Sequence, residues 1–161
     1  MVARIVANSK YPLPLLISLV TAILVIAGSV NSWADVRNEA YVGGQIRITS
    51  VNGTDADGYV TLAAGTVTLI FLLWRLARRH SILLAAGGPV VLFFISGVLG
   101  VLNLMDLSAS SGAFSAFNLP SLGGAFIRTQ VDVGWGLIVV TVSSWAGLTS
   151  AAYQFRNELS L

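Results

Sequence analysis

Long apolar stretches alternate with shorter polar segments along the chain. The first stretch holds no charged residue for 24 positions between Lys10 and Asp35. Roughly 20 helical residues cross a hydrocarbon core of about 30 Å, so this stretch is long enough to span a membrane. The pattern predicts four such spans, at 13–33, 58–76, 81–105 and 133–153. The predicted fold is therefore all-α: a four-transmembrane-helix bundle forming a single membrane domain over 1–161.

Proline and glycine mark the beginning of two of these spans. Pro12 and Pro14 lie at the start of the first span, where a helix makes no use of the missing N–H group. The third span contains Gly87-Gly88-Pro89 near its beginning. Pro89 removes a helical hydrogen bond, so we expect a kink at this point.

Two polar connectors, 34–57 and 106–132, are expected outside the membrane. In the first, Gln45–Val51 alternates apolar and polar residues and is followed by the turn pair Asn52-Gly53. This pattern predicts a short strand or β-hairpin, with an irregular loop as the alternative. In the second, the Ser, Gly, Asn and Pro content of 107–127 indicates a surface or interfacial loop.

Composition excludes several classes of protein. Hydrophobic residues make up 55% of the chain, charged residues make up 10%, and the mean hydropathy is +0.81. A water-soluble globule, a disordered segment and a nucleic-acid-binding domain all need a larger polar share. Cysteine is absent, which excludes disulfides, iron–sulfur clusters and thiolate zinc sites.

Residues that could carry chemistry are scarce. His80 is the only histidine and stands beside Arg78 and Arg79, so a solvated position at the membrane boundary explains it better than metal or quinone binding. No charged residue lies in the middle of a span, where proton relays and ion-coupled transporters need one. The sequence therefore predicts no catalytic, cofactor-binding or metal-binding residue, and we do not expect an enzyme.

Positive charge marks one side of the predicted bundle. The basic residues that flank spans on that side are Arg4, Lys10, Arg75, Arg78 and Arg79. The connectors 34–57 and 106–132 instead carry net charges of −2 and −1. The positive-inside rule places both termini and the short connector 77–80 in the cytoplasm of a multi-pass plasma-membrane protein. Arg75, Arg78 and Arg79 are also candidates to bind anionic lipid headgroups, although fixing the topology already accounts for them.

Aromatic residues support the same orientation, because Trp and Tyr prefer the membrane interfaces. Inner ends of spans carry Tyr11, Trp74 and Tyr153, and outer ends carry Trp33, Tyr59 and Trp135. Trp145 falls in mid-span, where we expect it to contact a neighbouring helix. The basic start followed by an apolar run also describes a signal peptide, but no Ala-x-Ala site precedes the first charge, so we expect the first span to be retained.

Small residues recur at helical spacing in three of the spans. They allow helix backbones to approach closely, which is how helices associate in lipid. These helix-packing candidates are Thr61, Gly65, Ser96, Gly100, Ser143, Gly147 and Ala151. The spacing alone does not say whether they contact helices of this chain, which is the default, or helices of another protein.

The chain resembles small four-span membrane proteins of actinobacteria that have an Asp-Gly pair at the start of the second helix, here Asp57-Gly58. The resemblance implies an accessory subunit of a larger membrane complex, such as a respiratory supercomplex or a lipid-import machine. It carries over no functional residue.

Three functions follow as hypotheses. The first is a non-catalytic subunit that binds other integral membrane subunits and steadies their assembly, with membrane lipids but no nucleic acid as further partners. The second is an oligomeric channel or small-solute carrier, with Gly87-Gly88-Pro89 near the permeation path. The third, a membrane enzyme acting on lipid or quinone, would need catalytic groups clustered at one interface.

Overall fold

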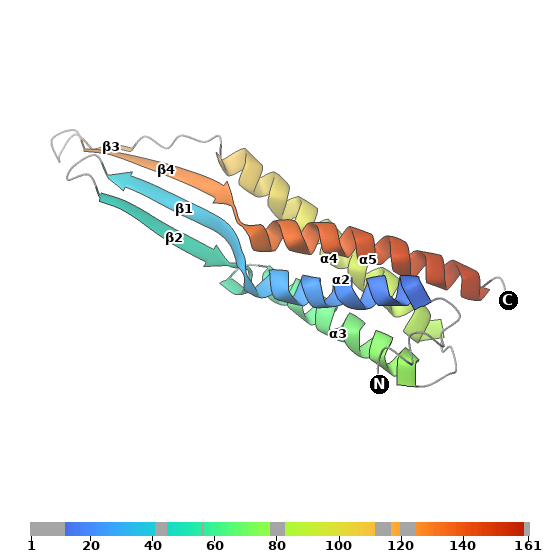
Figure 1. Cartoon of the computed structure of the whole chain (residues 1–161). Coiled ribbons are helices and arrows are strands. Elements are labelled where there is room, and N and C mark those ends of the chain that lie inside the picture. Colours follow the sequence, from blue (N-terminus) through green and yellow to red (C-terminus); the bar gives the residue numbers. More distant parts are fainter. Residues whose placement is uncertain are drawn as a thin grey trace.

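The fold combines a helical bundle with a small sheet (Figure 1). The computed structural model describes residues 12–40, 45–55, 57–77, 83–111, 117–119 and 125–159. Four helices are long and apolar enough to cross a membrane, as predicted: α2 (Pro12–Val30), α3 (Gly58–Ala77), α4 (Leu83–Ser111) and α5 (Trp135–Leu159). Helix α2 begins at Pro12, at the position where proline was expected to start it.

The sheet is antiparallel, and its strand order is β2-β1-β4-β3. Its strands are β1 (Ser32–Ala40), β2 (Gln45–Asn52), β3 (Phe117–Leu119) and β4 (Ala125–Val133). Strand β1 leaves α2 almost directly, and β4 leads into α5 through Gly134 alone. A short 3-10 helix, η1 (Gly53–Asp55), joins β2 to α3.

The structure corrects two expectations about the first connector and confirms a third. The first helix ends at Val30, because Ser32 and Trp33 belong to β1 rather than to the span. Asn52-Gly53 is not a hairpin turn, since Gly53 begins η1. The expected strand at Gln45–Val51 is present as β2.

The second connector differs most from its prediction. It was expected to be a loop between 107 and 127, but α4 continues to Ser111, and β3 and β4 follow within the same connector. Pairing with β1 explains β4, because the register aligns Ala34–Ala40 with Val133–Ile127 across the sheet. A strand held by a partner so distant in sequence leaves only a weak local pattern.

The four helices pack as a ring. Contacts join α2 to α3, α3 to α4, α4 to α5, and α5 back to α2. The main core of the ring is formed by Leu15, Leu19, Ala22, Val25, Leu72, Phe93 and Ala151. A second core below the sheet contains Trp33, Leu137 and Val140, against which Leu104, Leu107 and Val133 pack.

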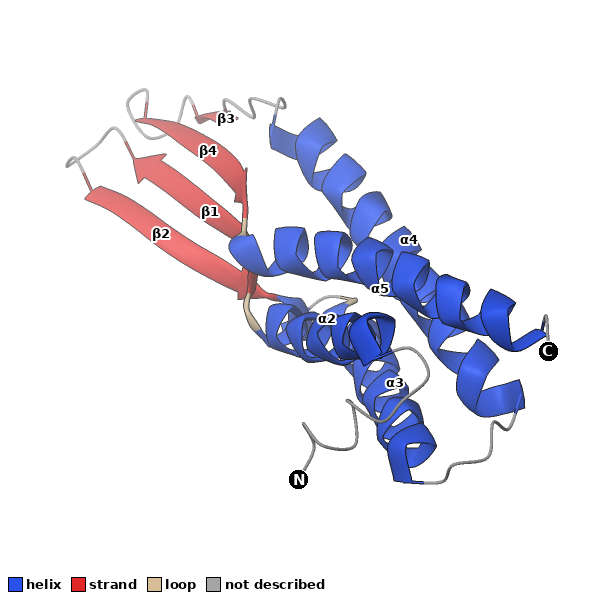
Figure 2. Ribbon diagram, turned by 45° about the vertical axis from the view of Figure 1, so that its right-hand side comes forward, coloured by secondary structure: helices blue, strands red, loops and turns tan. Residues whose placement is uncertain are grey.

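The sheet prolongs the bundle in the direction of the helices and stands at one end of it (Figure 2). Each long strand adjoins one helix in the chain: β2 leads to α3, β1 follows α2, and β4 precedes α5. The strand order β2-β1-β4 therefore repeats the order in which α3, α2 and α5 contact one another. The strands therefore lie in the same spatial order as the helices to which they are connected.

A candidate interaction site where the bundle meets the sheet

Trp33 connects the sheet to the bundle. The pairing of β1 with β2 is irregular between Ser32 and Ala34, so Trp33 lies in a bulge. A bulge redirects its side chain, and here the indole is only 2% exposed. Its Nε1–H donates to the carbonyl of Gly28 at 3.0 Å, at the end of α2. Trp33 is thus buried and is not the interfacial anchor that its position in the sequence suggested.

Backbone hydrogen bonds fix the same junction from both sides. The N–H of Gly134 donates to the carbonyl of Trp33 at 2.9 Å, and the N–H of Gly53 donates to the carbonyl of Asn31 at 3.0 Å. A side chain at Gly53 would overlap the carbonyl of Ser29 and the indole of Trp33. Only glycine fits there, so η1 is held directly against the end of α2.

Helices α2 and α5 approach each other closely just below this junction. A Cβ on Gly28 would lie 2.8 Å from the carbonyl oxygen of Gly136, and a Cβ on Gly136 would lie 2.6 Å from that of Gly28. Contact between two glycine backbones brings the two helices together where β1 and β4 emerge. The two strands consequently start side by side and pair at once.

Carboxylates gather at the base of the sheet. Asp35 and Asp132 are directly opposite each other in the β1–β4 register, and the Ser32 hydroxyl donates to Asp35 Oδ1 at 2.9 Å. On the β2 side, Asp55 Oδ2 accepts from the N–H of Asn52 at 3.3 Å. Among the described residues, no group of three or more His, Cys, Asp or Glu could hold a metal ion.

All seven predicted helix-packing residues are buried within this chain. A Cβ on Gly65 would lie 3.0 Å from Ile26 of α2, so α2 and α3 are in close contact there. Gly147 faces the ring of Phe93, and Gly100 faces Thr141. These small-residue faces hold the bundle's own helices together, so they are not free for another protein.

The far end of the bundle contains a polar cluster that the sequence did not reveal. Arg75 donates from a guanidinium nitrogen to Gln154 Oε1 at 2.7 Å, and Gln154 Nε2 donates to Ser18 Oγ at 3.0 Å. Ser150 Oγ lies 3.2 Å from Ser18 Oγ and donates to the carbonyl of Pro14 at 2.6 Å. Gln154 is only 1% exposed. In the sequence, Gln154 cannot be told apart from a surface glutamine near the end of a helix. Only its contacts with residues far away in the chain show its role.

Hydroxyl groups occur elsewhere in the bundle. Ser29 and Thr61 share a hydrogen bond of 2.7 Å between α2 and α3. Thr68 Oγ1 and Ser144 Oγ are buried without a hydrogen-bond partner. The Gly-Gly-Pro segment lies within a continuous α4, and a Cβ on Gly88 would meet the ring of Phe71 at 3.1 Å. The Phe71 ring therefore lies directly against Gly88.

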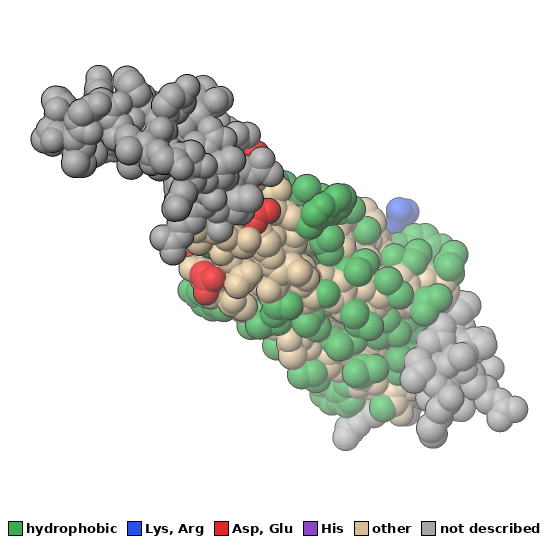
Figure 3. Space-filling model, turned by 60° about the vertical axis from the view of Figure 1, so that its left-hand side comes forward, with side chains coloured by type: hydrophobic (Ala, Val, Ile, Leu, Met, Phe, Trp, Pro, Cys, Tyr) green, Lys and Arg blue, Asp and Glu red, His purple; other side chains and the backbone are tan. Residues whose placement is uncertain are grey.

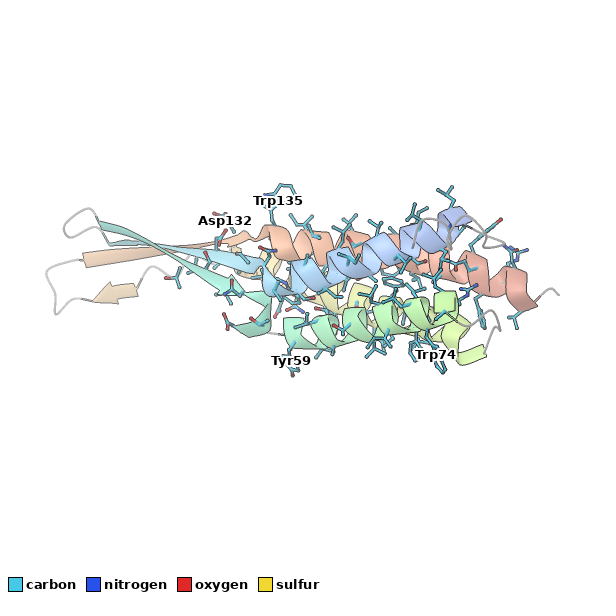
Figure 4. The ribbon with its side chains drawn as sticks, turned by 60° about the horizontal axis from the view of Figure 1, so that its bottom comes forward. Tyr59, Trp74, Asp132 and Trp135 are labelled. Carbon is cyan, nitrogen blue, oxygen red and sulfur yellow. The ribbon has the colours of Figure 1, made fainter. Side chains whose placement is uncertain are left out.

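The outer surface of the bundle fits a membrane. Hydrophobic side chains cover much of the part of the bundle that Figure 3 shows in colour, and a few acidic side chains lie at its sheet end. Tyr59 and Trp135 point outward at the sheet end, 61% and 77% exposed, and Trp74 points outward near the opposite end (Figure 4). Trp145 contacts α4 as expected, edge-on to Phe94 with ring centroids 6.5 Å apart.

Several predicted residues lie outside the described part of the chain. These are Tyr11, Arg78, Arg79 and His80, together with the basic residues Arg4 and Lys10. Arg75, the one described member of the lipid-headgroup candidates, is half-buried and contacts Gln154.

Comparison with known proteins adds no family to this picture. No protein-family model matches the chain, and no curated protein is significantly similar to it.

Proposed function

We propose that this chain is a non-catalytic subunit of a larger membrane assembly, inserted in the plasma membrane with its sheet outside and both termini in the cytoplasm. In this role the bundle anchors the chain in lipid and the sheet binds a partner subunit. Arg75 and Arg156, in the last turns of α3 and α5 at the end of the bundle away from the sheet, support this orientation.

One observation carries the proposal: specific contacts at its base attach the sheet to the bundle. The Trp33 indole of β1 donates to the end of α2, and the Gly53 backbone, which follows β2, donates to the Asn31 carbonyl between α2 and β1. The Gly28–Gly136 contact holds α2 and α5 together where β1 and β4 emerge. A sheet fixed in this way loses little further conformational entropy when a partner binds, which favours a docking role. The seven small residues serve the bundle itself, so the sheet is the better candidate for partner contacts.

Co-purification tests the proposal directly. The tagged full-length chain, extracted from its own membranes in a mild detergent, should be recovered with stoichiometric integral membrane partners detectable by mass spectrometry. Recovery of this chain alone, under conditions that keep other membrane complexes intact, would contradict the proposal.

Single cysteines test the orientation, because the chain has none of its own. Thr54 and Leu159 are both exposed and lie at opposite ends of the bundle. A membrane-impermeant maleimide should label Thr54→Cys in intact cells and should label Leu159→Cys only after permeabilisation. The opposite result would invert the proposed topology.

A further inference from the structure

The sheet has one long open edge. Strand β2 pairs with β1 along residues 45–52 and is the outermost strand on its side. At the other side, β3 already covers part of β4 by pairing with Ala125–Ile127. The edge of β2 is therefore the longest unpaired backbone among the described strands.

The register shows which backbone groups of β2 point outward. Gly134 N–H donates to the Trp33 carbonyl, so the odd-numbered residues of β1 direct their N–H and C=O groups toward β4. Alternation along a strand then turns the even-numbered residues of β1 toward β2, where their partners are odd-numbered. The groups left facing outward are those of Ile46, Ile48 and Ser50.

The base of this edge is protected. Asn52, the next outward-facing residue, donates its N–H to the Asp55 carboxylate. Strand β2 contains no proline and no bulge, which are common means of blocking an edge. Such an edge is a template on which another strand can pair.

A second copy in the same membrane does not fit this edge. All copies in one membrane share the same strand direction, and the strands run along the direction of the helices (Figure 1). A two-fold axis along the membrane normal would therefore set two β2 strands parallel, with identical residues at the same height. A parallel ladder needs its outward-facing residues staggered by one position, which this symmetry does not provide.

An antiparallel partner strand must run away from the bundle, because β2 runs toward it. Within this chain β1 meets the same requirement, since it follows directly from α2. A foreign strand of this kind would continue from a transmembrane helix beside α3. The outer face of α3 exposes Val67, Ile70 and Leu73 to such a helix.

We infer that the edge of β2 at residues 46–50 binds an extended segment of another membrane protein, in antiparallel pairing, immediately after an outward-directed transmembrane helix of that protein. This inference rests on the proposed function and specifies the surface that carries it. A soluble peptide, or a second copy of this chain held in a facing membrane, would be a different occupant.

Proline at position 50 tests the edge without disturbing its pairing to β1. Ser50→Pro removes an outward N–H and places a ring in the edge, whereas the odd-numbered residues still bond to β1. Ser50→Ala, the matched control, keeps the N–H. A photoreactive benzoylphenylalanine in place of the exposed Thr49 reports the occupant in native membranes. We expect a cross-link to a membrane protein just after an outward-running helix, about tenfold weaker with Ser50→Pro and unchanged with Ser50→Ala.

Amide hydrogen exchange controls for folding. In the purified chain Ile48 and Ser50 should exchange faster than Thr49 and Val51, and the last two should stay protected in Ser50→Pro. Equal cross-linking in both variants, cross-links only to a second copy or to a soluble protein, or an equally slow Ile48 amide in the isolated chain would each overturn the inference. If partners still co-purify with Ser50→Pro as with the wild type, the proposed function stands and the edge inference fails.

Discussion

The helices and the strands of this protein follow one order but end differently. Helices α3, α2, α5 and α4 close into a ring, whereas strands β2, β1, β4 and β3 form an open sheet. Helix axes lie about 8–10 Å apart, so four of them enclose a core of side chains. Strands lie only about 4.8 Å apart, and four are too few to curl into a barrel.

This difference separates two kinds of stabilisation. Close contacts of small residues hold the helices of the bundle together. In lipid such contacts replace the hydrophobic drive available in water. Within the sheet, neighbouring strands pair their backbone groups with one another. The backbone groups on the outer side of β2 remain unpaired. A bound partner would therefore stabilise the sheet more than the bundle. Variants in each region can separate the two kinds of stabilisation.

The largest effect is expected where the two regions join. Gly53→Ala places a Cβ against the Ser29 carbonyl and the Trp33 indole, and backbone there cannot move aside. We expect a loss of roughly 3 kcal/mol in the free energy of unfolding, measured by thermal melts in detergent. Gly97→Ala is the control, because its Cβ would lie 3.3 Å from the half-exposed Trp145 ring. Similar melting temperatures for both variants would show that the close contact at Gly53 does not stabilise the fold.

The second-largest effect is expected from a variant that disturbs the packing of α4 against α5. Gly147→Val would push against the Phe93 ring, which is 1% exposed and lies between α4 and α5. We expect a loss of about 2 kcal/mol in unfolding titrations with a denaturing detergent. Adding Phe93→Leu should recover part of that loss because it frees space. A double variant no more stable than Gly147→Val alone would place the strain elsewhere.

The polar cluster at the far end should contribute less. Gln154→Leu leaves the Ser18 hydroxyl and the Arg75 guanidinium without their shared partner, so we expect a loss of about 1–2 kcal/mol. Thr149→Ala is a suitable control, because this exposed hydroxyl bonds only within its own helix, to the Ala146 carbonyl. Gln154→Leu as stable as the control would mean that the cluster adds nothing to closure.

The smallest effect concerns the hydroxyl pair between α2 and α3. A double-mutant cycle of Ser29→Ala and Thr61→Val isolates their 2.7 Å contact. Hydrogen bonds between membrane helices average about 0.6 kcal/mol in such cycles, and we expect a coupling energy of that size. Additive effects of the two substitutions would assign both hydroxyls to bonds within their own helices.

The sequence predicted the helices well because lipid solubility leaves a local signal. Uninterrupted apolar length located all four helices, and Pro12 marked the start of the first. The sheet was harder, because the partner of β4 lies in β1, far away in the chain. Trp33 was misread for the same reason: its apolar side chain fits a span, and only the bulge shows that it turns into the bundle.

The candidate site residues show the same contrast between a local signal and long-range contacts. The small residues were visible as a periodic pattern, and the structure buries all of them. Gln154 left no such pattern, because its partners Arg75 and Ser18 come from two other helices. The outward groups of β2 depend on the register of three strands, which no local pattern specifies.

The burial of Trp33 gives the protein an internal optical reporter. Its indole is shielded and hydrogen-bonded, whereas Trp74, Trp135 and Trp145 are all exposed on the bundle surface. In a variant that keeps Trp33 as the sole tryptophan, a blue-shifted emission that resists quenching by soluble iodide would signal an intact joint. Loosening of the sheet would then appear as a red shift while the helices remain folded.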